Sequence, residues 1–329
     1  MLHSTLKIDT EKQKPTRDGF GVGLVALGDT NELVVALTAD LKESTRVEAF
    51  AEKFPKRFFE IGVAEQNLAT VASGLANYGK IPFITSYATF SPGRNWEQIR
   101  TTICINDVPV KVIGCHAGLT VGPDGATHQA LEDVAIMRTL PNMTVIVPCD
   151  SEEARKATLA IGSDPVAVKK PAYLRLGREK MPQLTTPETP FEIGKAYYAF
   201  ETEGADVTIV ACGSLVYEAV LAAQELGSEG INVDVLNLHT IKPIDREAVL
   251  AAAHKTHAIV TAEEHQLAGG MGSAVAEVLV EEFPVPMEFV AVRDQYGQSG
   301  KPVELMSHYK VNKDAIKVAV HDVLKRKGA

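Results

Sequence analysis

The segment Arg57-Phe58-Phe59-Glu60-Ile61-Gly62-Val63-Ala64-Glu65-Gln66-Asn67 carries the chain from a strand into a helix. Its apolar first part stops at Gly62, which is typical of a strand end. Apolar residues then recur at helical spacing: Leu68, Val71, Ala72 and Leu75. Glu65 therefore falls at a helix start, where free N–H groups and the helix dipole favour a negative charge. Acidic residues are common in a first helical turn, so a chemical role for Glu65 depends on the rest of the chain.

Apolar runs and helical patterns alternate through the first half of the chain. Strands are expected at 34–39, 58–61, 80–85, 110–115 and 143–147, with helices at 18–26, 95–103, 129–139 and 151–161. Continuous β-branched runs fit the central strands of a parallel sheet, and the alternation predicts an α/β fold. Ligands of such sheets bind beyond the carboxyl ends of the strands. The polar segments that follow the strands should therefore meet there: Asp40, 62–65, 87–94, 116–128 and 175–178.

A second α/β unit follows a proline-rich stretch, 181–190, which is typical of an interdomain linker. Its expected strands are 207–211, 231–236 and 258–262, and its expected helices are 215–226, 246–254, 271–282 and 313–325. The sequence thus predicts a loosely held arm at 1–17, a first domain at 18–180 with a mostly parallel sheet, the linker, and a smaller domain at 191–329.

Composition excludes several classes of protein. The 329 residues suffice for two domains, and 45% apolar with 23% charged residues is normal for a globular chain. The net charge of −9 argues against a nucleic-acid surface. No apolar run has the ~18 residues that a membrane span needs, and the N-terminus lacks a signal-peptide layout. The four cysteines show no metal-binding spacing, which favours buried thiols in a reducing cytoplasm.

Three motifs together resemble the C-terminal portion of transketolase. They are Gly62-Val63-Ala64-Glu65-Gln66-Asn67, Tyr87-Ala88-Thr89-Phe90 and Gly122-Pro123-Asp124-Gly125-Ala126-Thr127-His128-Gln129, in that order. The resemblance extends from about Asp18 to the end. It implies a pyrimidine-binding domain followed by a transketolase C-terminal domain. It also implies that Glu65 is the carboxylate that activates thiamine diphosphate, because a carboxylate at the pyrimidine ring lets the cofactor's own amino group act as a base.

The resemblance assigns further residues to the cofactor. Phe90, with Tyr87 nearby, matches the position that stacks on the aminopyrimidine ring. Asp40 matches an aspartate near the cofactor. From the residues alone, the two aromatics could equally belong to the core, and Asp40 could equally be a strand-end residue or a helix cap. The segment 91–94 replaces a stretch in which the family often has another aromatic, so the pocket wall is expected to differ there.

The resemblance also assigns the substrate. It gives Asp124 a substrate hydroxyl, and it places His128 near the oxygens of the donor ketose, with a part in catalysis. It places His116, Ser44 and Arg178 near the phosphate. An arginine fork suits phosphate oxygens, whereas Ser44 could also be a helix N-cap.

Half of a transketolase site is missing from the sequence. The diphosphate and a divalent metal require Gly-Asp-Gly followed 25–30 residues later by asparagines, and no such pair occurs. The chain therefore resembles the second subunit of a split transketolase, active only with an N-terminal partner subunit. The resemblance implies an α2β2 assembly with self-association, transfer of a two-carbon ketol unit between phosphorylated sugars, and Mg2+ or Ca2+ held mainly by the partner. No metal ligand is assigned to this chain.

Three alternative functions remain open from the sequence. The β subunit of a 2-oxoacid dehydrogenase shares the activating glutamate but lacks the Asp-Gly-x-Thr-His pattern. A 1-deoxyxylulose-5-phosphate-synthase-like enzyme shares more, normally in one longer chain. A non-catalytic structural or regulatory subunit would not need Glu65, Asp124 and His128 together. A dinucleotide-binding domain is excluded, because no G-x-G-x-x-G follows a strand. The Gly269–Gly272 turn resembles a structural or subunit-contacting part of the C-terminal domain.

Overall fold

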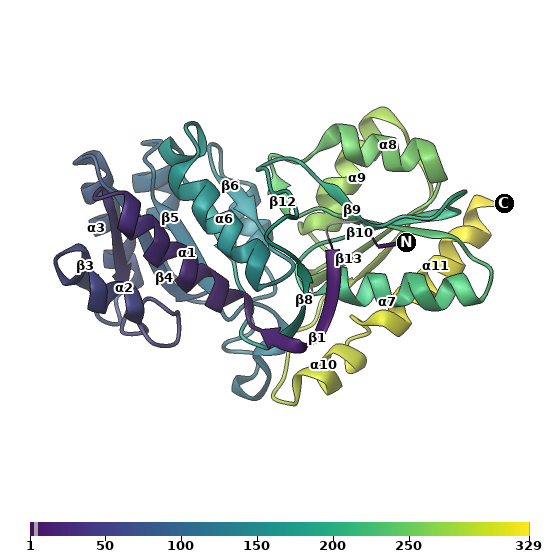
Figure 1. Cartoon of the computed structure of the whole chain (residues 1–329), viewed down its shortest axis with the longest axis horizontal. Coiled ribbons are helices and arrows are strands. Elements are labelled where there is room, and N and C mark those ends of the chain that lie inside the picture. The colour runs from purple at the N-terminus through teal and green to yellow at the C-terminus, as the bar shows by residue number, and fades with distance from the viewer. Residues whose placement is uncertain (3–5, 329) are drawn as a thin grey trace.

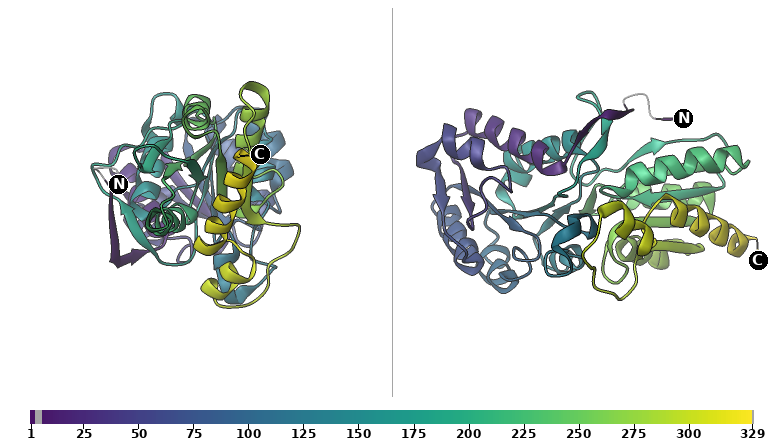
Figure 2. Two further views of the ribbon diagram at one scale, coloured as in Figure 1. Left: turned by 90° about the vertical axis from the view of Figure 1, so that its right-hand side faces the viewer. Right: turned by 90° about the horizontal axis from the view of Figure 1, so that it is seen from below.

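The chain forms two α/β domains that lie side by side (Figure 1). The structure is a computed structural model and describes residues 1–2 and 6–328. The right-hand view of Figure 2, from below, again shows the two domains next to each other along the long axis. The predicted fold class, two α/β units with mostly parallel sheets, is confirmed.

The first domain is built on a seven-stranded sheet. Its strands, in order across the sheet, are β12 (Thr240–Lys242), β6 (Thr144–Ile146), β7 (Ala172–Arg175), β5 (Lys111–Cys115), β4 (Ile81–Tyr87), β2 (Val34–Thr38) and β3 (Phe58–Glu60). All neighbouring strands are parallel except β12, which is antiparallel to β6. The strands from β6 to β3 therefore direct their carboxyl ends to the same edge.

Helices cover both faces of this sheet. Helices α1 (Thr16–Thr30) and α6 (Ser151–Ser163) pack together on one face. Helices α3 (Glu65–Asn77) and α5 (Asp133–Arg138) cover the other with a π-helical turn at Ile99–Cys104. Successive residues of β2 enter the two cores in turn, as the period of a strand requires. This two-sided burial explains why its sequence is a continuous apolar run.

The second domain is built on a five-stranded sheet. Its strands, in order, are β14 (Met287–Val292), β13 (Ile259–Gln266), β10 (Val207–Ala211), β11 (Val233–Asn237) and β9 (Tyr197–Phe200), of which β9 is antiparallel to β11. Helices α8 (Arg246–Thr256) and α9 (Met271–Glu282) cover one face, and α7 (Leu215–Ser228) and α11 (Lys313–Lys327) cover the other. The remaining helices are α2 (Glu48–Lys53), α4 (Trp96–Gln98), α10 (Pro302–His308) and the 3-10 helices Pro55–Arg57, Leu119–Asp124 and Ala167–Lys169.

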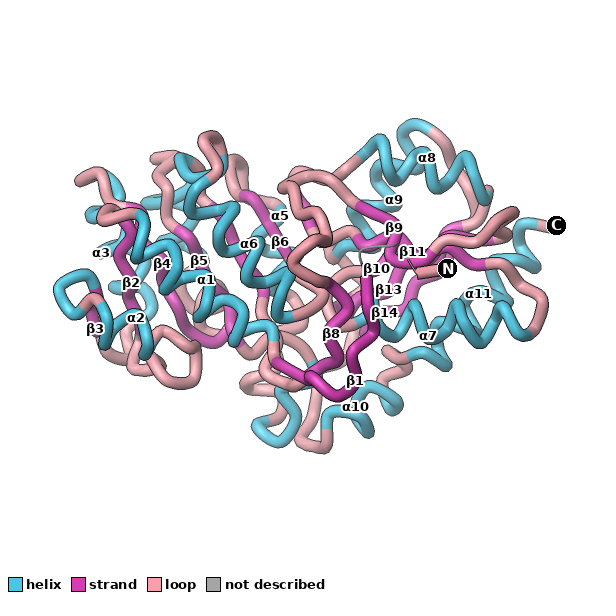
Figure 3. Tube along the Cα trace, viewed as in Figure 1, coloured by secondary structure: helices cyan, strands magenta, loops and turns pink. Residues whose placement is uncertain are grey.

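The prediction of a loosely held arm is wrong for the residues next to the first domain. Leu6–Lys14 forms β1, which pairs antiparallel with β8 (Met181–Thr185), and Figure 3 shows the two strands at the junction of the domains. The predicted linker therefore contains a strand as well. A two-stranded pairing between polar, proline-containing segments depends on contacts across the whole first domain, and local apolar patterns do not reveal it.

A strand from the second half of the chain also belongs to the sheet of the first domain. Strand β12 leaves the second domain and adds an edge to the seven-stranded sheet, and one apolar core runs through both domains. The expected helix at 95–103 is split into α4 and the π-helical turn, and the one at 129–139 begins only at Asp133. No helix in the described ranges is long and apolar enough to cross a bilayer.

Candidate functional site

The loops that follow β2 and β3 are held together by one carboxylate. Glu60, the last residue of β3, accepts hydrogen bonds at Oε1 from the backbone N–H groups of Asp40 at 2.8 Å and Gly62 at 2.9 Å. Asp40 has a left-handed backbone with φ of +59°, a conformation that costs a non-glycine residue free energy. Glu60 therefore stabilises the turn that leads into α3 and fixes where this helix begins.

Glu65 is the first residue of α3, as expected, and its side chain is only 1% exposed. Ser86 Oγ on β4 donates to its Oε1 at 3.3 Å, and Arg94 Nη1 donates to its Oε2 at 2.6 Å. The Asn95 amide donates to its backbone carbonyl at 2.9 Å. A buried carboxylate needs such partners, and here both side-chain partners come from β4 and the loop after it.

The rings of Tyr87, Phe90, His116 and His128 lie close together, next to the Glu65 partner Arg94. Tyr87 and Phe90 stack with centroids 6.1 Å apart, and His128 approaches Phe90 edge-on at 5.4 Å. The ring of His116 lies 4.0 Å from Tyr87. The guanidinium carbon of Arg94 lies 4.7 Å from the Phe90 centroid. The loop after β4 and both ends of the glycine-rich loop after β5 thus converge, as the sequence predicts.

His116 is the most constrained of these residues. It is buried, has a left-handed backbone with φ of +54°, and its Nε2 lies 3.1 Å from Arg17 Nη1. Burial, followed by the charges of Arg17 and Arg178, lowers the pKa of His116 to about 3. The imidazole is therefore neutral at pH 7. Because Arg17 has only donors, Nε2 accepts, and Nδ1 carries the proton.

The Nδ1–H group of His116 has no acceptor among the described residues. Buried donors are normally satisfied, so this orphaned group fits a ligand that brings an oxygen. Arg17 also donates to the carbonyl of Ser44 at 2.8 Å, which places Ser44 beside the same group. Ser44 is not the cap of a helix, because α2 begins only at Glu48.

The other predicted substrate residues lie on the same side but are less constrained. Arg178, after β7, donates to the carbonyl of Val121 at 2.8 Å and so joins two loops of the site. Asp124 ends the Leu119–Asp124 helix and is exposed, as is Asp40. Among the described residues, no hydrogen bond or ring contact joins either aspartate side chain to the four rings.

Sequence reasoning missed four residues of this site: Arg17, Glu60, Ser86 and Arg94. Arg17 fell inside the predicted arm, and Arg94 lay in the segment where the family motif breaks. A charged residue such as Arg94, in a segment that departs from the family motif, can indicate that the pocket is built differently there. Ser86 and Glu60 belong to strands, where their side chains are read as part of the sheet.

The residues present fit one side of an aminopyrimidine site. A buried carboxylate, a neighbouring aromatic face and a neutral histidine with a free donor suit a planar, nitrogen-containing ring and oxygen-bearing substrates. Among the described residues there is no group of three or more His, Cys, Asp and Glu side chains that could hold a metal ion.

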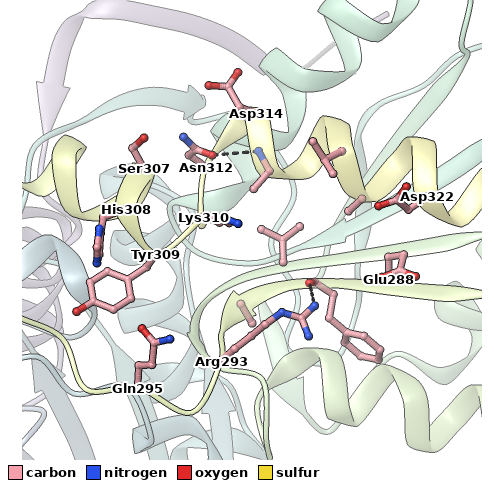
Figure 4. A pocket seen from close by; sticks show the side chains of 16 residues that line it. Glu288, Arg293, Gln295, Ser307, His308, Tyr309, Lys310, Asn312, Asp314 and Asp322 are labelled. Atoms are coloured by element: carbon pink, nitrogen blue, oxygen red, sulfur yellow. Dashed lines mark hydrogen bonds between the residues drawn. The ribbon is translucent and has the colours of Figure 1, made fainter.

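Two sizeable cavities are lined by residues other than those assigned to the site, although the second borders the neighbours of His116 and Arg178. One of about 580 Å³ lies among β14, α10 and α11 and is lined by residues such as Arg293, Tyr309 and Asp322 (Figure 4). Another of about 470 Å³ lies at the domain junction beside Arg175, Glu264 and Lys313. Neither contains a predicted site residue, so volume alone does not locate the chemistry in this chain.

Comparison with known families accounts for nearly the whole chain. Residues 12–183 match the family model "Transketolase, pyrimidine binding domain", and residues 196–316 match "Transketolase, C-terminal domain". The three motifs of the site lie within the first match.

The chain is similar to several transketolase subunits over almost its full length. It is 42% identical to the 6-deoxy-6-sulfo-D-fructose transketolase subunit SqwH of Clostridium sp. (strain MSTE9), covering 94% of this chain and 95% of that protein. It is 39% identical to a putative transketolase C-terminal section of Methanocaldococcus jannaschii, covering 95% and 97%. With human transketolase the identity is 34%, and the chain spans 49% of that protein.

A solved structure supports the same assignment. The chain superimposes with a TM-score of 0.86 and 45% identity on a structure described as "Split gene transketolase, inactive beta4 tetramer", covering 95% of this chain and 99% of that one. The matched domains, the relatives of similar length and this superposition lead to one conclusion. The chain belongs to the transketolase family, and it consists of the family's pyrimidine-binding and C-terminal domains.

Proposed function

We propose that this chain is the C-terminal subunit of a split, thiamine-diphosphate-dependent transketolase. In this proposal it transfers a two-carbon ketol unit from a ketose phosphate to an aldose phosphate, together with an N-terminal partner subunit. The observation that carries the proposal is the buried Glu65 carboxylate. It lies at the carboxyl edge of the sheet, and its side-chain partners are a serine and a partly exposed arginine.

Each residue of the site has a role in this proposal. When bound, thiamine diphosphate supplies the electron sink for breaking and forming the carbon–carbon bond. Glu65 holds or exchanges the proton at the pyrimidine nitrogen, and Phe90, with Tyr87 behind it, provides an aromatic face for the ring. Asp40 borders the cofactor. His128, which lies edge-on to Phe90, exchanges protons with the oxygens of the donor sugar.

The substrate side of the proposal rests on a cluster of positive charge. Arg17, Arg178 and Arg46 all lie close enough to His116 to lower its pKa. A cluster of arginines with a neutral histidine donor and Ser44 suits an anionic group such as phosphate. Asp124 is assigned a hydroxyl of the sugar. Two similar proteins are named for sugars with a sulfonate or a phosphate, which agrees with an anionic substrate.

The assembly is part of the proposal. The chain carries only the pyrimidine half of the cofactor site, so the diphosphate and a Mg2+ or Ca2+ ion are assigned mainly to the partner. A similar split protein is described as inactive when it forms a β4 tetramer, which supports dependence on another subunit. We assign an α2β2 assembly with self-association of this chain, working in the cytoplasm.

Subunit mixing tests the proposal. Turnover of a ketose phosphate and an aldose phosphate is measured with this chain alone, the N-terminal subunit alone, and both in equal amounts, with thiamine diphosphate and Mg2+ present. The expected result is turnover only in the mixture, and only with the cofactor. Full turnover by this chain alone would contradict the split-subunit assignment, and turnover of pyruvate instead of ketose phosphates would favour the 2-oxoacid dehydrogenase alternative.

A further inference from the structure

Arg94 lies where two groups assigned to the cofactor ring meet. We propose that its guanidinium is a placeholder for the aminopyrimidine: it binds Glu65 and the Phe90 face in the cofactor-free chain and must leave both when the cofactor binds. This inference rests on the proposed use of thiamine diphosphate. It adds a residue and a competition step that the proposed mechanism does not contain.

The contacts of Arg94 copy those expected of the ring. Its Nη1 donates to Glu65 Oε2 at 2.6 Å, and its guanidinium carbon lies 4.7 Å from the centroid of Phe90. A guanidinium is planar, carries N–H donors at its edge and stacks on aromatic faces. An aminopyrimidine is also planar, and when protonated it presents an N–H donor to a carboxylate. The two groups therefore compete for the same carboxylate and the same aromatic face.

The energetics favour a placeholder in the lone chain. The Glu65 side chain is 1% exposed, and a buried carboxylate without a counterion is costly. Its only other side-chain partner within the described residues is the Ser86 hydroxyl at the longer distance of 3.3 Å. Arg94 thus compensates the charge of Glu65 until another donor replaces it.

Arg94 is also the partner that can leave. Its side chain is 42% exposed, and it lies on the loop after β4 rather than within a strand or long helix. A long side chain with one end in solvent can be rehydrated at low cost. The backbone around it stays fixed, because Asn95 remains bonded to the carbonyl of Glu65.

Competition predicts the direction of a mutational effect. A state in which Arg94 occupies the site cannot bind the ring, so its population reduces the apparent affinity. Removing the guanidinium should therefore tighten cofactor binding. If Arg94 instead contacted the cofactor directly, removing it would weaken binding. The two roles differ in sign, so a merely structural residue cannot imitate the expected result.

The test is calorimetric titration of thiamine diphosphate into the complex of this chain with its N-terminal subunit, in Mg2+. Arg94→Gln should bind the cofactor about threefold to tenfold more tightly than the wild type, because an ion pair with one partner partly exposed is weaker than a fully buried charged hydrogen bond. The matched control is Arg100→Gln, which removes an exposed arginine of the nearby π-helical turn and should leave the dissociation constant unchanged. Equal or weaker binding by Arg94→Gln would overturn the inference.

A second variant covers the case in which Arg94→Gln fails to assemble. Arg94→Lys keeps a positive charge for Glu65 but lacks the planar guanidinium that stacks on Phe90. Its dissociation constant for the cofactor should therefore be lower than that of the wild type and higher than that of Arg94→Gln. A value above that of the wild type would overturn the inference. If the wild-type complex itself binds no thiamine diphosphate, the proposed function fails; if the wild type binds and the Arg94 variants do not bind more tightly, only the placeholder fails.

Discussion

Two buried carboxylates, one in each domain, are held in opposite ways. Glu263 on β13 accepts from the backbone N–H groups of Met271 at 2.7 Å and Gly272 at 2.8 Å, at the start of α9. Glu65, at the start of α3, is held by the side chains of Ser86 and Arg94. Both side chains are at most 2% exposed, so burial alone does not distinguish them.

Under the proposed function, this difference separates a structural carboxylate, Glu263, from a catalytic one, Glu65. The backbone partners of Glu263 cannot leave without unwinding α9, and a Cβ on Gly270 would lie 2.3 Å from its Oε2, so only glycine permits this approach. The main partner of Glu65 is a side chain that reaches solvent. The anion bound at the Gly269–Gly272 turn is therefore the Glu263 carboxylate of the chain itself. This supports the structural interpretation of that motif.

The largest expected effect is on turnover. Glu65→Gln keeps the shape and the hydrogen bond of the side chain but removes the group that exchanges the proton. We expect turnover of the complex to fall at least ~100-fold, within the range for proton-transfer groups. Steady-state kinetics would measure it, with Glu52→Gln on the exposed side of α2 as the matched control. Near-wild-type turnover by Glu65→Gln would remove Glu65 from the mechanism.

Glu263→Ala should show the opposite pattern. It leaves two buried N–H groups of α9 without an acceptor, so the free energy of unfolding should fall by about 2–3 kcal/mol. Urea unfolding measures this change, and turnover per folded complex should stay close to that of the wild type. Glu281→Ala, which breaks only a surface pair with Arg246, is the control and should change stability little. A large loss of turnover without a loss of stability would blur the distinction between the two carboxylates.

The same contrast applies to two arginines at the carboxyl end of β7, of which Arg175 ends the strand and Arg178 follows it. Arg175 is buried against Asp133, whereas Arg178 is half-buried and bonded only to a loop carbonyl in the described structure. Arg178→Ala should therefore raise KM for phosphorylated sugars roughly 10-fold or more, the usual worth of a charged hydrogen bond. KM for unphosphorylated analogues should change far less. Equal changes for both sugars would contradict a phosphate contact.

A smaller effect concerns the pH dependence of stability. The pKa of His116 is about 3 in the folded chain, against 6.5 for the ordinary imidazole. Between these values the unfolded chain binds more protons, so stability is full above pH 6.5 and is lost as the pH falls. We expect His116→Gln to lessen the loss of stability between pH 7.5 and pH 5 by roughly 1–2 kcal/mol.

Urea unfolding at both pH values checks this expectation. His239, whose pKa burial lowers to about 4, contributes to the slope in both proteins, so their difference isolates His116. An unchanged slope would show that His116 is not held neutral.

The central strands and the position of Glu65 were predictable, because both rest on local patterns. Residues 34–37 of β2 are apolar because the strand is buried on both faces, and Glu65 follows a strand at the start of a helical repeat. The meeting of the loops followed from the parallel sheet alone. The roles of the site residues remain proposals.

What could not be predicted depends on long-range contacts. The pairing of β1 with β8 and the transfer of β12 to the other sheet join segments that lie far apart in the chain. Arg17 approaches His116 only because α1 passes the end of β5. Arg94 was unforeseen because its segment departs from the family motif, and its partner is set by the fold of the loop after β4.

The most direct test is a structure of the complex with the N-terminal subunit and bound thiamine diphosphate, in which the distance from the Glu65 carboxylate to the pyrimidine ring nitrogen is measured. A distance of about 2.6–3.2 Å, the reach of a hydrogen bond, with Phe90 against the ring and Arg94 displaced, is the result expected here. A cofactor bound far from Glu65, with Arg94 still paired to that carboxylate, would contradict the account.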